Sequence, residues 1–359
     1  MEHSHRTEDG TPIFDSLDID LVVKVLTNTA FSPFFVGIIP IFYIFQGARP
    51  SDSIVISSAI YWVVICAFWS FKWFSQLYRN QGSLVLRPMP LDWSEQIVVV
   101  TGGASGIGEL LANTMAVRNV TVVVLDVNPI ITENYNIAYY KCDVSKWEEV
   151  EAVSKKIIEE IGEPTILINN AGVVQGKLLV DLTPQDVQQT FAVNTLSHFW
   201  ILKAFLPSLL KNKSGHIVTM SSALGMTGVA QMSDYCASKA AVIGLHESLR
   251  YELDKSIFTL YKCPQIRTTL VCPGHVLTPM FSTPVAVVKK IIAALDDQYS
   301  ENILLPFYTN FIPFIGHLPS FLRDLVQWIS GADYAMENFI KVSGLRPDES
   351  SLPEDFAKQ

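Results

Sequence analysis

Residues 98–108 read Val98-Val-Val-Thr-Gly-Gly-Ala-Ser-Gly-Ile-Gly108, a run of β-branched residues that breaks into glycines before Glu109-Leu-Leu-Ala112. Such a short apolar run is typical of a buried parallel strand, and glycines directly after it allow a tight turn and close backbone approach to a phosphate. The helix that follows would direct its N-terminus at that anion. The order of strand, glycine turn and helix therefore predicts a dinucleotide site. The plainer alternative is an ordinary glycine turn between a core strand and a helix.

An acidic residue at the end of the next apolar run supports the dinucleotide interpretation. Asp126 follows Thr121-Val-Val-Val-Leu125, where its carboxylate can accept hydrogen bonds from the adenosine ribose hydroxyls. No Lys or Arg follows it closely, and the glycine loop contains none. Because a 2′-phosphate would meet a carboxylate and no cation, the sequence favours NAD(H) and keeps NADP(H) as the alternative.

Composition indicates that part of the chain lies in lipid. Of the 359 residues, 49% are hydrophobic and only 17% are charged, and the mean hydropathy is +0.28. The net charge of −9, without a Lys/Arg cluster, argues against nucleic acid as a partner. The five cysteines form no CxxC pair and no metal-ligand spacing, so we expect a reducing compartment and no metal site.

The chain before residue 96 predicts a membrane anchor. We assign residues 1–29 as a polar acidic tail, 30–80 as the anchor and 81–95 as a linker. Within the anchor, residues 54–71 are eighteen residues without a charge, followed by Lys72. This meets the length of about 18 to 20 residues needed to cross a bilayer as a transmembrane helix. The alternative, a buried helix of the globular domain, is disfavoured because the dinucleotide fold begins too late to give this segment a core.

A shorter apolar segment precedes the transmembrane helix. Residues 30–45 are broken by Pro33 and Pro40, so they suit a bent or half-inserted helix better than a straight span. The polar turn between the two segments indicates a hairpin. Cations after the hairpin orient the following domain toward the cytosol.

From residue 96 to residue 305, strand and helix signals alternate. This pattern predicts a Rossmann-type α/β fold, a doubly wound parallel sheet of seven strands with helices on both faces. A capping box at Ser145–Glu148 is expected to begin one helix, and Thr183-Pro184 a long one. Further helices are expected over 235–251 and 284–295, and the later strands over 138–142, 165–168, 216–219, 268–271 and 303–305.

Tyr235 and Lys239 lie four residues apart on a predicted helix, and therefore on one face. A phenol titrates near pH 10 in water, and an adjacent ammonium favours the phenolate and lowers that pKa. Alone, such a pair is usually an ordinary amphipathic contact. Ser222 changes the interpretation because it ends a strand, and open α/β sheets bind their ligands at the carboxyl ends of strands.

Five motifs in this order resemble the short-chain dehydrogenase/reductase family over about residues 96–305: Thr101–Gly108, Asn169–Gly172, Ser222, Tyr235–Lys239 and Pro273-Gly274. Further motifs resemble its membrane-attached branch, which includes retinol and 17-beta-hydroxysteroid dehydrogenases of the endoplasmic reticulum and lipid droplets: Ser197–Trp200, Lys203–Pro207 and Gly244–Leu249. The resemblance implies hydride transfer between nicotinamide C4 and a carbonyl or alcohol carbon. It also implies a membrane location with the catalytic domain facing the cytosol.

The resemblance assigns roles to individual residues. Tyr235 would be the acid/base, Lys239 would lower its pKa and hold the nicotinamide ribose, and Ser222 would bond the reacting oxygen. Asn194 would support a water for proton relay. Asp143 would bond the adenine, Thr278 would reach the carboxamide, and further cofactor contacts would come from Gly102, Ser105, Gly106, Ile107, Gly108, Asp126, Val144, Asn170, Ala171, Gly172, Pro273, Gly274 and Val276. Besides Ser222, the expected substrate contacts are Met226, Met232, His275, Met280 and Phe281.

Two departures from the family pattern affect the periphery of the site. Only eleven residues separate Asp126 from Ala138, which is short for a crossover helix and leaves the adenine side less covered. The loop after Gly274 is short for a substrate lid. The apolar segment 306–344 offers a replacement, expected to lie against the bilayer and guide a lipophilic substrate, before a polar tail at 345–359. The alternative is a C-terminal helix packed on the core.

Three functions follow from these features. The first is a membrane-anchored NAD(H)-linked oxidoreductase for a lipophilic alcohol, ketone or aldehyde of retinoid, steroid or long-chain lipid type. The others are an NADPH-dependent ketoreductase of a secondary-metabolite pathway and a non-catalytic membrane or lipid-droplet scaffold. The intact set of catalytic residues argues against the scaffold. A homodimer is compatible with the sequence, and His198, His216 and His246 are expected to be helix or strand-edge residues without a catalytic role.

Overall fold

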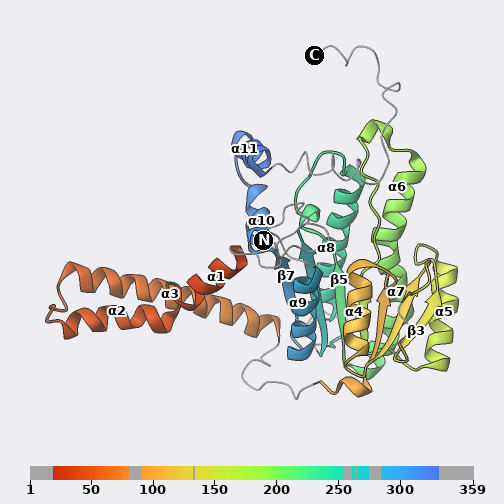
Figure 1. The fold of residues 1–359 in the computed structure, drawn as a ribbon, viewed down its shortest axis with the longest axis horizontal. Helices are drawn as coiled ribbons and strands as arrows, with labels where there is room; N and C mark the ends of the chain where they lie inside the picture. The colour runs from red at the N-terminus through yellow and green to blue at the C-terminus, as the bar shows by residue number, and fades with distance from the viewer. Residues whose placement is uncertain are drawn as a thin grey trace, which may run out of the picture.

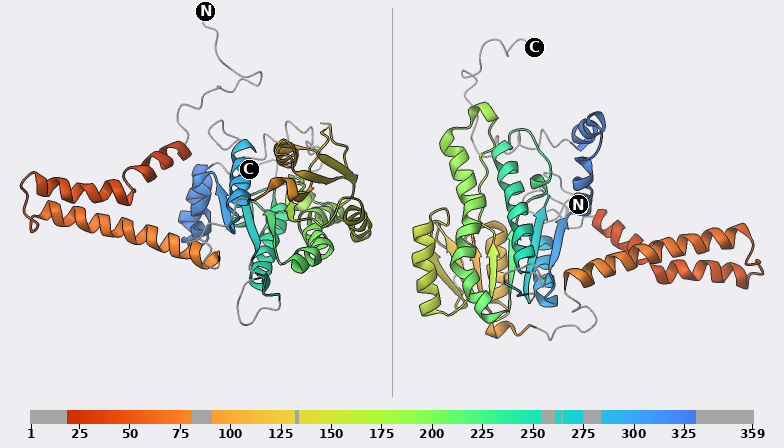
Figure 2. Two further views of the ribbon diagram at one scale, coloured as in Figure 1. Left: turned by 90° about the horizontal axis from the view of Figure 1, so that it is seen from below. Right: turned by 180° about the vertical axis from the view of Figure 1, so that it is seen from behind.

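The computed structural model describes residues 19–80, 91–131, 134–253, 261–263, 265–274 and 284–330. A helical hairpin projects from one side of an α/β domain (Figure 1). Two further views show the same projection, so the hairpin stands clear of the sheet and its covering helices (Figure 2).

The α/β domain is built on one sheet of seven parallel strands in the order β3-β2-β1-β4-β5-β6-β7. The strand order reverses between β1 and β4, and ligands of doubly wound sheets bind at such a switch point. The predicted Rossmann-type fold is confirmed. The strands are β1 Ile97–Thr101, β2 Thr121–Asp126, β3 Ile137–Lys141, β4 Ile166–Asn169, β5 Gly215–Met220, β6 Ile266–Pro273 and β7 Glu301–Leu305.

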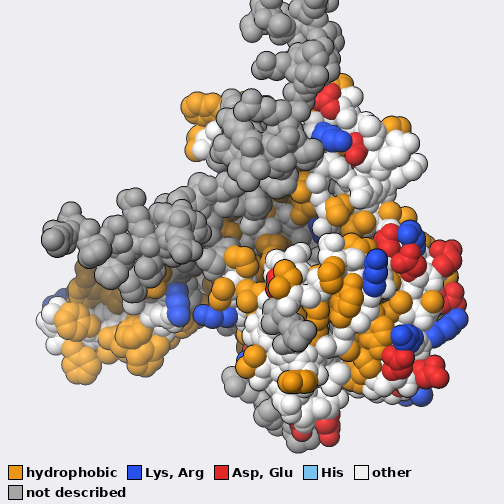
Figure 3. Space-filling view, turned by 45° about the vertical axis from the view of Figure 1, so that its right-hand side comes forward, with side chains coloured by type: hydrophobic (Ala, Val, Ile, Leu, Met, Phe, Trp, Pro, Cys, Tyr) orange, Lys and Arg blue, Asp and Glu red, His pale blue; other side chains and the backbone are white. Residues whose placement is uncertain are grey.

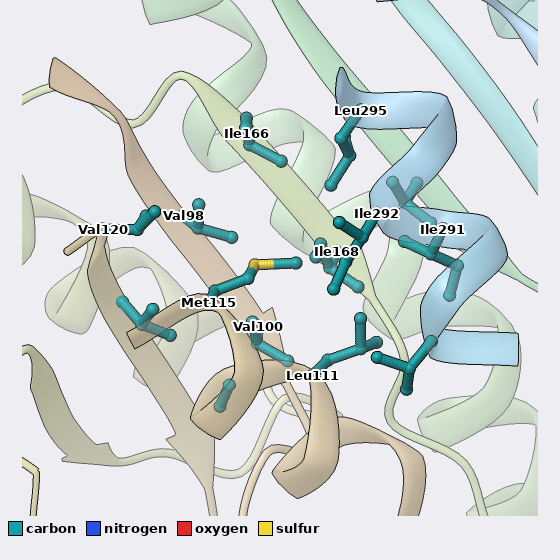
Figure 4. Close-up of a cluster of buried hydrophobic side chains, with 14 of the residues drawn as sticks. Val98, Val100, Leu111, Met115, Val120, Ile166, Ile168, Ile291, Ile292 and Leu295 are labelled. Atoms are coloured by element: carbon teal, nitrogen blue, oxygen red, sulfur yellow. The ribbon is translucent and has the colours of Figure 1, made fainter. Parts of the chain in front are cut away.

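Helices cover both faces of the sheet because successive strand residues point to opposite sides. Val98 and Val100 pack with α4 Gly106–Ala116 and α9 Pro284–Asp297, as Figure 4 shows. Val99 faces the other layer, with α5 Trp147–Glu160, α7 Ser197–Asn212 and α8 Ser233–Leu253. Burying one such aliphatic side chain stabilises the fold by about 1.5 to 3 kcal/mol.

Two predicted helix starts had different outcomes. Thr183 caps α6 Pro184–Phe191 in a capping box, accepting from Asp186 N at 3.1 Å, as the sequence predicted. The capping box at Ser145–Glu148 is wrong, because α5 begins at Trp147 and the Ser145 hydroxyl donates to Asp143 Oδ1 at 2.6 Å. The Ser145 side chain is therefore bonded to Asp143 and does not cap the helix.

The long helix predicted after Thr183 contains an irregular turn. After α6, residues Ala192–Leu196 form a π-helical turn, and α7 continues the run to Asn212. Such single π turns often occur at functional sites. Between β2 and β3, the described residues 127–131 and 134–136 contain no helix, in agreement with the short crossover.

The projecting hairpin consists of α2 Pro33–Phe45 and α3 Ser53–Arg79, which lie side by side and are preceded by α1 Ile19–Asn28. Helix α1 falls within the range 1–29 that the sequence analysis assigned as a tail. Of the described helices, α3 is long and apolar enough to cross a membrane, with a mean hydropathy of 2.0. Hydrophobic side chains occupy much of the hairpin surface that is visible in Figure 3.

The anchor is joined to the sheet by a buried polar contact. Asn80, directly after α3, is 1% exposed. Its Oδ1 accepts from Ser300 N at 2.8 Å, and its backbone oxygen accepts from Arg267 Nη1 at 3.4 Å. Since both partners belong to the edge where β6 and β7 begin, α3 is fixed against that edge.

Beyond β7 the chain forms short helices with exposed apolar side chains. These are η5 Phe307–Phe311, which contacts α1, then α10 Ile312–Ile315 and α11 Ser320–Ser330. On α11, Phe321 and Trp328 are 71% and 69% exposed. The described part of the segment expected as a lid, residues 306–330, thus presents exposed apolar side chains.

Candidate active site

The glycine turn after β1 has the shape that close approach of a phosphate requires. Gly102 and Gly106 have φ values of +65° and +59°, which glycine adopts without strain. A Cβ on Gly108 would collide with the Gly102 carbonyl oxygen and lie 2.5 Å from Asn170 Nδ2. Helix α4 begins at Gly106, with the exposed Ser105 as its N-cap and the half-buried Ile107 in its first turn. The turn therefore fits a dinucleotide pyrophosphate at a helix N-terminus.

Hydrogen bonds lock the glycine turn to the turn after β4. Thr101 Oγ1 accepts from Asn170 N at 3.0 Å and from Ala171 N at 3.1 Å. Asn170 Nδ2 in return donates to Thr101 O and Gly102 O at 3.1 and 3.0 Å. Thr101 belongs to the glycine motif, but no role was expected for it from the sequence. Its position at the end of the strand was the available signal.

The carboxylate of Asp126 lies beside the glycine turn, as predicted. Its Oδ2 accepts from Ala104 N at 3.0 Å, and its Oδ1 accepts from Asn128 N at 2.9 Å. These bonds fix the carboxylate at the end of β2. Among the described residues 121–131, no Lys or Arg accompanies it.

Asp143 lies near the carboxyl end of β3, where the adenine side of the site was expected. Burial raises its carboxyl pKa, but hydrogen bonds from Ser145 and the ammonium of Lys146 outweigh burial and lower the pKa overall. The neighbouring Val144 is buried in the core. The adenine contact of these residues stays a prediction.

The structure brings Ser222, Tyr235 and Lys239 together at the carboxyl edge of the sheet. Ser222 follows β5, and its side chain forms a hydrogen bond with that of Tyr235 in the first turn of α8. Ser222 Oγ also accepts from Leu224 N at 3.2 Å, and donates to Pro273 O at 3.4 Å. Lys239 Nζ lies 5.8 Å from the centre of the Tyr235 ring.

The pKa values of this group differ from the sequence-based expectation. Burial raises the pKa of Tyr235 above its ordinary value, although the hydrogen bond with Ser222 acts in the opposite direction. Burial also lowers the pKa of Lys239 to about 8. Its ammonium donates to Met220 O at 3.0 Å rather than to the phenol. The expected lowering of the Tyr235 pKa is therefore wrong for the protein groups alone.

Asn194, in the π turn, positions the turn after β4. Its Oδ1 accepts from Val173 N at 2.7 Å, and its Nδ2 donates to Val173 O at 2.9 Å and to Ser238 Oγ at 3.1 Å. A Cβ added to Gly172 would lie 3.5 Å from both Asn194 Oδ1 and Lys239 Nζ. Asn194 thus lies beside the catalytic group, and its support of a relay water stays a prediction.

Some of the expected substrate contacts lie beside Tyr235. The buried Met232 and Cys236 form an apolar cluster with Tyr235, Val174 and Leu224. The half-buried Met226 lies in the adjacent loop. Val174, Leu224 and Cys236 were not expected from the sequence, because Val174 reaches the cluster from the segment after β4 and Leu224 from the short helix η4 Ala223–Gly225. Gly274 packs against Tyr308, while His275, Val276, Thr278, Met280 and Phe281 lie outside the described residues.

Of the remaining histidines, His198 and His246 lie on helices α7 and α8, and His216 lies in strand β5. His198, His216 and His246 are all buried, and burial is the main cause that lowers their pKa values to about 3, 3 and 4. Within the described part of the chain, no group of three or more His, Cys, Asp or Glu could hold a metal ion.

The fold and this site define a nicotinamide-dependent oxidoreductase of the Rossmann type. A sequence model of the family described as short chain dehydrogenase matches residues 96–286. The chain therefore belongs to the short-chain dehydrogenase family, and it is an NAD(P)-dependent oxidoreductase of its retinol dehydrogenase-like branch. The sequence-based family assignment is confirmed.

Individual relatives agree with this membership. The chain is 36% identical over 269 residues to Short-chain dehydrogenase/reductase family 16C member 6 of Bos taurus, covering 70% of this chain and 84% of that protein. It is 36% identical over 263 residues to Retinol dehydrogenase 10-B of Danio rerio, covering 63% and 73%.

Solved structures share the fold. A metagenomic short-chain oxidoreductase in complex with NADP is 27% identical, with a TM-score of 0.51 over 59% of this chain and 97% of that one. A 4-hydroxyisoleucine dehydrogenase complexed with NADH has a TM-score of 0.52 at 22% identity, over 59% and 96%, and shows the fold alone.

Proposed function

We propose that this chain is a membrane-anchored enzyme that transfers a hydride between NAD(H) and a lipophilic alcohol, ketone or aldehyde of retinoid, steroid or long-chain lipid type. The hydrogen bond between Ser222 and Tyr235, beside the apolar cluster around Met232, carries the proposal. This arrangement places a hydroxyl that can exchange a proton beside apolar side chains that suit an apolar substrate. Relatives named retinol dehydrogenase support the substrate class.

The protein residues supply binding and proton management, and the bound nicotinamide supplies or accepts the hydride. Ser222 orients the substrate oxygen, and Tyr235 exchanges a proton with it. Lys239, buried beside the Tyr235 ring, holds a positive charge that favours the phenolate when the tyrosine gives up its proton. The glycine turn would hold the pyrophosphate of the cofactor, and Asp126 would hold its adenosine ribose.

The choice of NAD(H) rests on the carboxylate of Asp126 at the end of β2. A 2′-phosphate placed there would be repelled by this carboxylate, and the described residues 127–131 provide no cation to compensate. An NADPH-dependent ketoreductase is the competing function. Dissociation constants for NADH and NADPH separate the two, and tighter NADPH binding would exclude the NAD(H) assignment.

The C-terminal helices are proposed as the entrance for a lipophilic substrate. Gln327 Nε2 on α11 donates to Gly228 O at 3.3 Å, so α11 reaches the loop between Met226 and Met232. The exposed Phe321 and Trp328 on the same helix suit contact with a bilayer. Substrate dissolved in lipid would then enter beside the apolar cluster.

The location proposed for the enzyme is the membrane of the endoplasmic reticulum or a lipid droplet, with the catalytic domain in the cytosol. Helix α3 supplies the span, and its exposed apolar side chains support contact with lipid. Lys72 and Arg79 at its end favour the cytosolic side for the domain that follows.

A homodimer is proposed through the face formed by α7 and α8. A groove of about 680 Å³ lies between them, lined by apolar residues that include the exposed Phe199. Lys203 and Glu252 also line this groove. A second copy of the chain, related by a two-fold axis, would cover the apolar lining and pair these opposite charges.

Turnover of a panel of alcohols and ketones by the detergent-solubilised protein tests the proposed function. We expect NAD⁺-dependent oxidation of long apolar alcohols and little turnover of short polar ones. Activity confined to polar substrates would exclude the lipophilic class. Cofactor binding without turnover of any substrate would favour the scaffold.

A further inference from the structure

Side chains of α3 form hydrogen bonds with the backbone at the break between α1 and α2. The two helices meet at an angle of 46°. A break of this kind frees backbone carbonyls from their helical partners. Two of them accept from side chains of α3: Tyr61 Oη donates to Ala30 O at 2.8 Å, and Trp69 Nε1 donates to Phe31 O at 2.8 Å. Trp62 Nε1 donates to Pro33 O, in the first turn of α2, at 2.9 Å.

Tyr61 and Trp62 lie in the middle of the apolar run of α3, and Trp69 lies two residues before its end, with Lys72 Nζ 5.2 Å from the centre of its ring. Residues 61–69 fall within the uncharged run 54–71. If α3 crosses the bilayer, the break therefore lies within the hydrocarbon. An unsatisfied carbonyl there costs several kcal/mol, whereas in water it would need no protein donor. In lipid these carbonyls need donors from the protein, whereas in water the solvent would supply them.

Other polar side chains of the hairpin also bond within the protein. Asn28 Nδ2 donates to Lys24 O at 2.8 Å, and Thr29 Oγ1 donates to Val25 O at 2.7 Å. Ser57 and Ser58 donate to backbone oxygens one turn earlier on α3. The large apolar side chains point outward instead, with Phe34 and Phe45 72% and 87% exposed. This surface matches acyl chains rather than water.

The lengths of α1 and α2, compared with the thickness of the bilayer, indicate whether this segment enters the membrane halfway or crosses it. Helix α2 has 13 residues, or about 20 Å, against about 30 Å of hydrocarbon. Helix α1 adds ten residues before the break. Gly37 allows the close approach of α2 to α3, because a Cβ there would lie 2.8 Å from Trp62 Nε1.

We infer that α1 and α2 form one broken span that crosses the bilayer antiparallel to α3. The turn at 46–52 then lies on the far side, and the N-terminus lies on the same side as the catalytic domain. The inference rests on the proposed membrane anchoring and adds the number of crossings and the side of the N-terminus.

Glycosylation of the full-length protein in microsomes tests this topology. One version carries a long polar insert with an Asn-Ser-Thr acceptor after Gly47, where the structure leaves open space. Another carries the same insert before residue 1. We expect the first to be glycosylated and the second to stay unmodified. Glycosylation of the N-terminal insert, or of neither insert, overturns the two-span topology.

An alkaline wash of the same microsomes separates this inference from the proposed anchoring. Retention in the membrane with a glycosylated N-terminal insert overturns only the broken span. Release into the wash overturns the membrane anchor itself, and the topology with it.

The three aromatic donors provide a second, independent test. Tyr61→Phe/Trp69→Phe removes two donors and keeps an aromatic ring, smaller at residue 69, at each position. We expect amide hydrogen exchange at residues 26–36 to accelerate about tenfold or more in detergent micelles. Trp73→Phe is the matched control, since Trp73 lies on the same helix outside the break, and its exchange pattern should equal that of wild type. Equal exchange in the double variant and the control overturns the assigned role of the donors.

Discussion

At the scale of single residues, the proposed proton transfer depends on the hydroxyl of Tyr235. Tyr235 is held by the hydrogen bond with Ser222 and by packing against Met232, and both contacts leave its ring fixed. In Tyr235→Phe the ring and the packing remain, so cofactor binding should be retained. We expect kcat to fall by about 100-fold or more, because general acid/base catalysis contributes about 10²- to 10⁴-fold.

Steady-state turnover of a long-chain alcohol, with a separate titration of NADH binding, measures both parts of this expectation. Ser222→Ala is the companion variant, because it keeps the phenol and removes the group that orients it. Near-normal turnover by Tyr235→Phe would falsify the assignment of the acid/base.

The buried Lys239 links the stability of the fold to pH. Its pKa of about 8 in the folded protein lies below the ordinary value near 10.4. Between these values the unfolded chain binds the proton and the folded chain does not, so the free energy of unfolding rises with pH from about 8 to 10. The full difference amounts to about 3 kcal/mol.

Lys239→Met removes this ionisation and should flatten that rise. Melting temperatures of wild type and variant across pH 7 to 10, in the same detergent, measure the difference between the two proteins. The variant should gain relative stability at pH 7 and lose activity. A difference that stays constant with pH would contradict the depressed pKa.

At the scale of elements, the strands were predictable because their signals are local. Each apolar run of β1, β2 and β4 is almost completely buried, so its sequence alone specified a strand. The cap of α5 was not predictable, because the choice of Ser145 between Asp143 and the helix depends on their relative placement. The π turn before α7 likewise leaves no local sequence signal.

The residues of the site likewise fall into those that local sequence signals predict and those that depend on tertiary structure. Ser222, Tyr235 and Lys239 could be predicted because helical spacing and a strand end place them on one edge. Val174 and Leu224 could not, since they approach Tyr235 from two separate segments, one after β4 and one in η4. The direction of the Tyr235 pKa was wrong because burial, which the sequence does not give, outweighs the hydrogen bond with Ser222.

The exposed face of α11 makes an element-scale prediction. Phe321→Ser/Trp328→Ser removes two large apolar side chains that touch bilayer in the proposed arrangement, while Gln327 still reaches Gly228. We expect the KM for a long-chain alcohol presented in vesicles to rise several-fold. Turnover of a short, water-soluble alcohol by the same variant should stay within a factor of two.

This comparison of two substrates separates entry from chemistry, because both reach the same Tyr235. Val180→Ser is the control variant, since Val180 is 86% exposed on η2 Leu179–Asp181, a different element. An unchanged KM for the vesicle-bound alcohol would exclude α11 as the entrance.

At the scale of the whole molecule, the apolar surface of the membrane anchor and the apolar groove of the catalytic domain lie on different elements. The hairpin surface belongs to α1–α3 and meets lipid in the proposed arrangement, whereas the groove between α7 and α8 belongs to the catalytic domain. Asn80 joins the end of α3 to the edge of the sheet. In the proposed arrangement, a partner on the groove has to leave the hairpin free to enter the membrane.

A second copy of the chain satisfies this condition, because a two-fold axis perpendicular to the bilayer inserts both hairpins on the same side. Leu245→Arg places a cation in the apolar lining of the groove, where burial against a second copy would leave it unpaired. We expect the wild type to be a dimer in detergent and the variant a monomer, as measured by light scattering corrected for bound detergent. Val180→Arg adds the same charge at an exposed site and should leave the dimer intact. A wild-type protein that is monomeric at all concentrations would exclude this interface, while the catalytic edge formed by β5, β6 and α8 would still be complete within one chain.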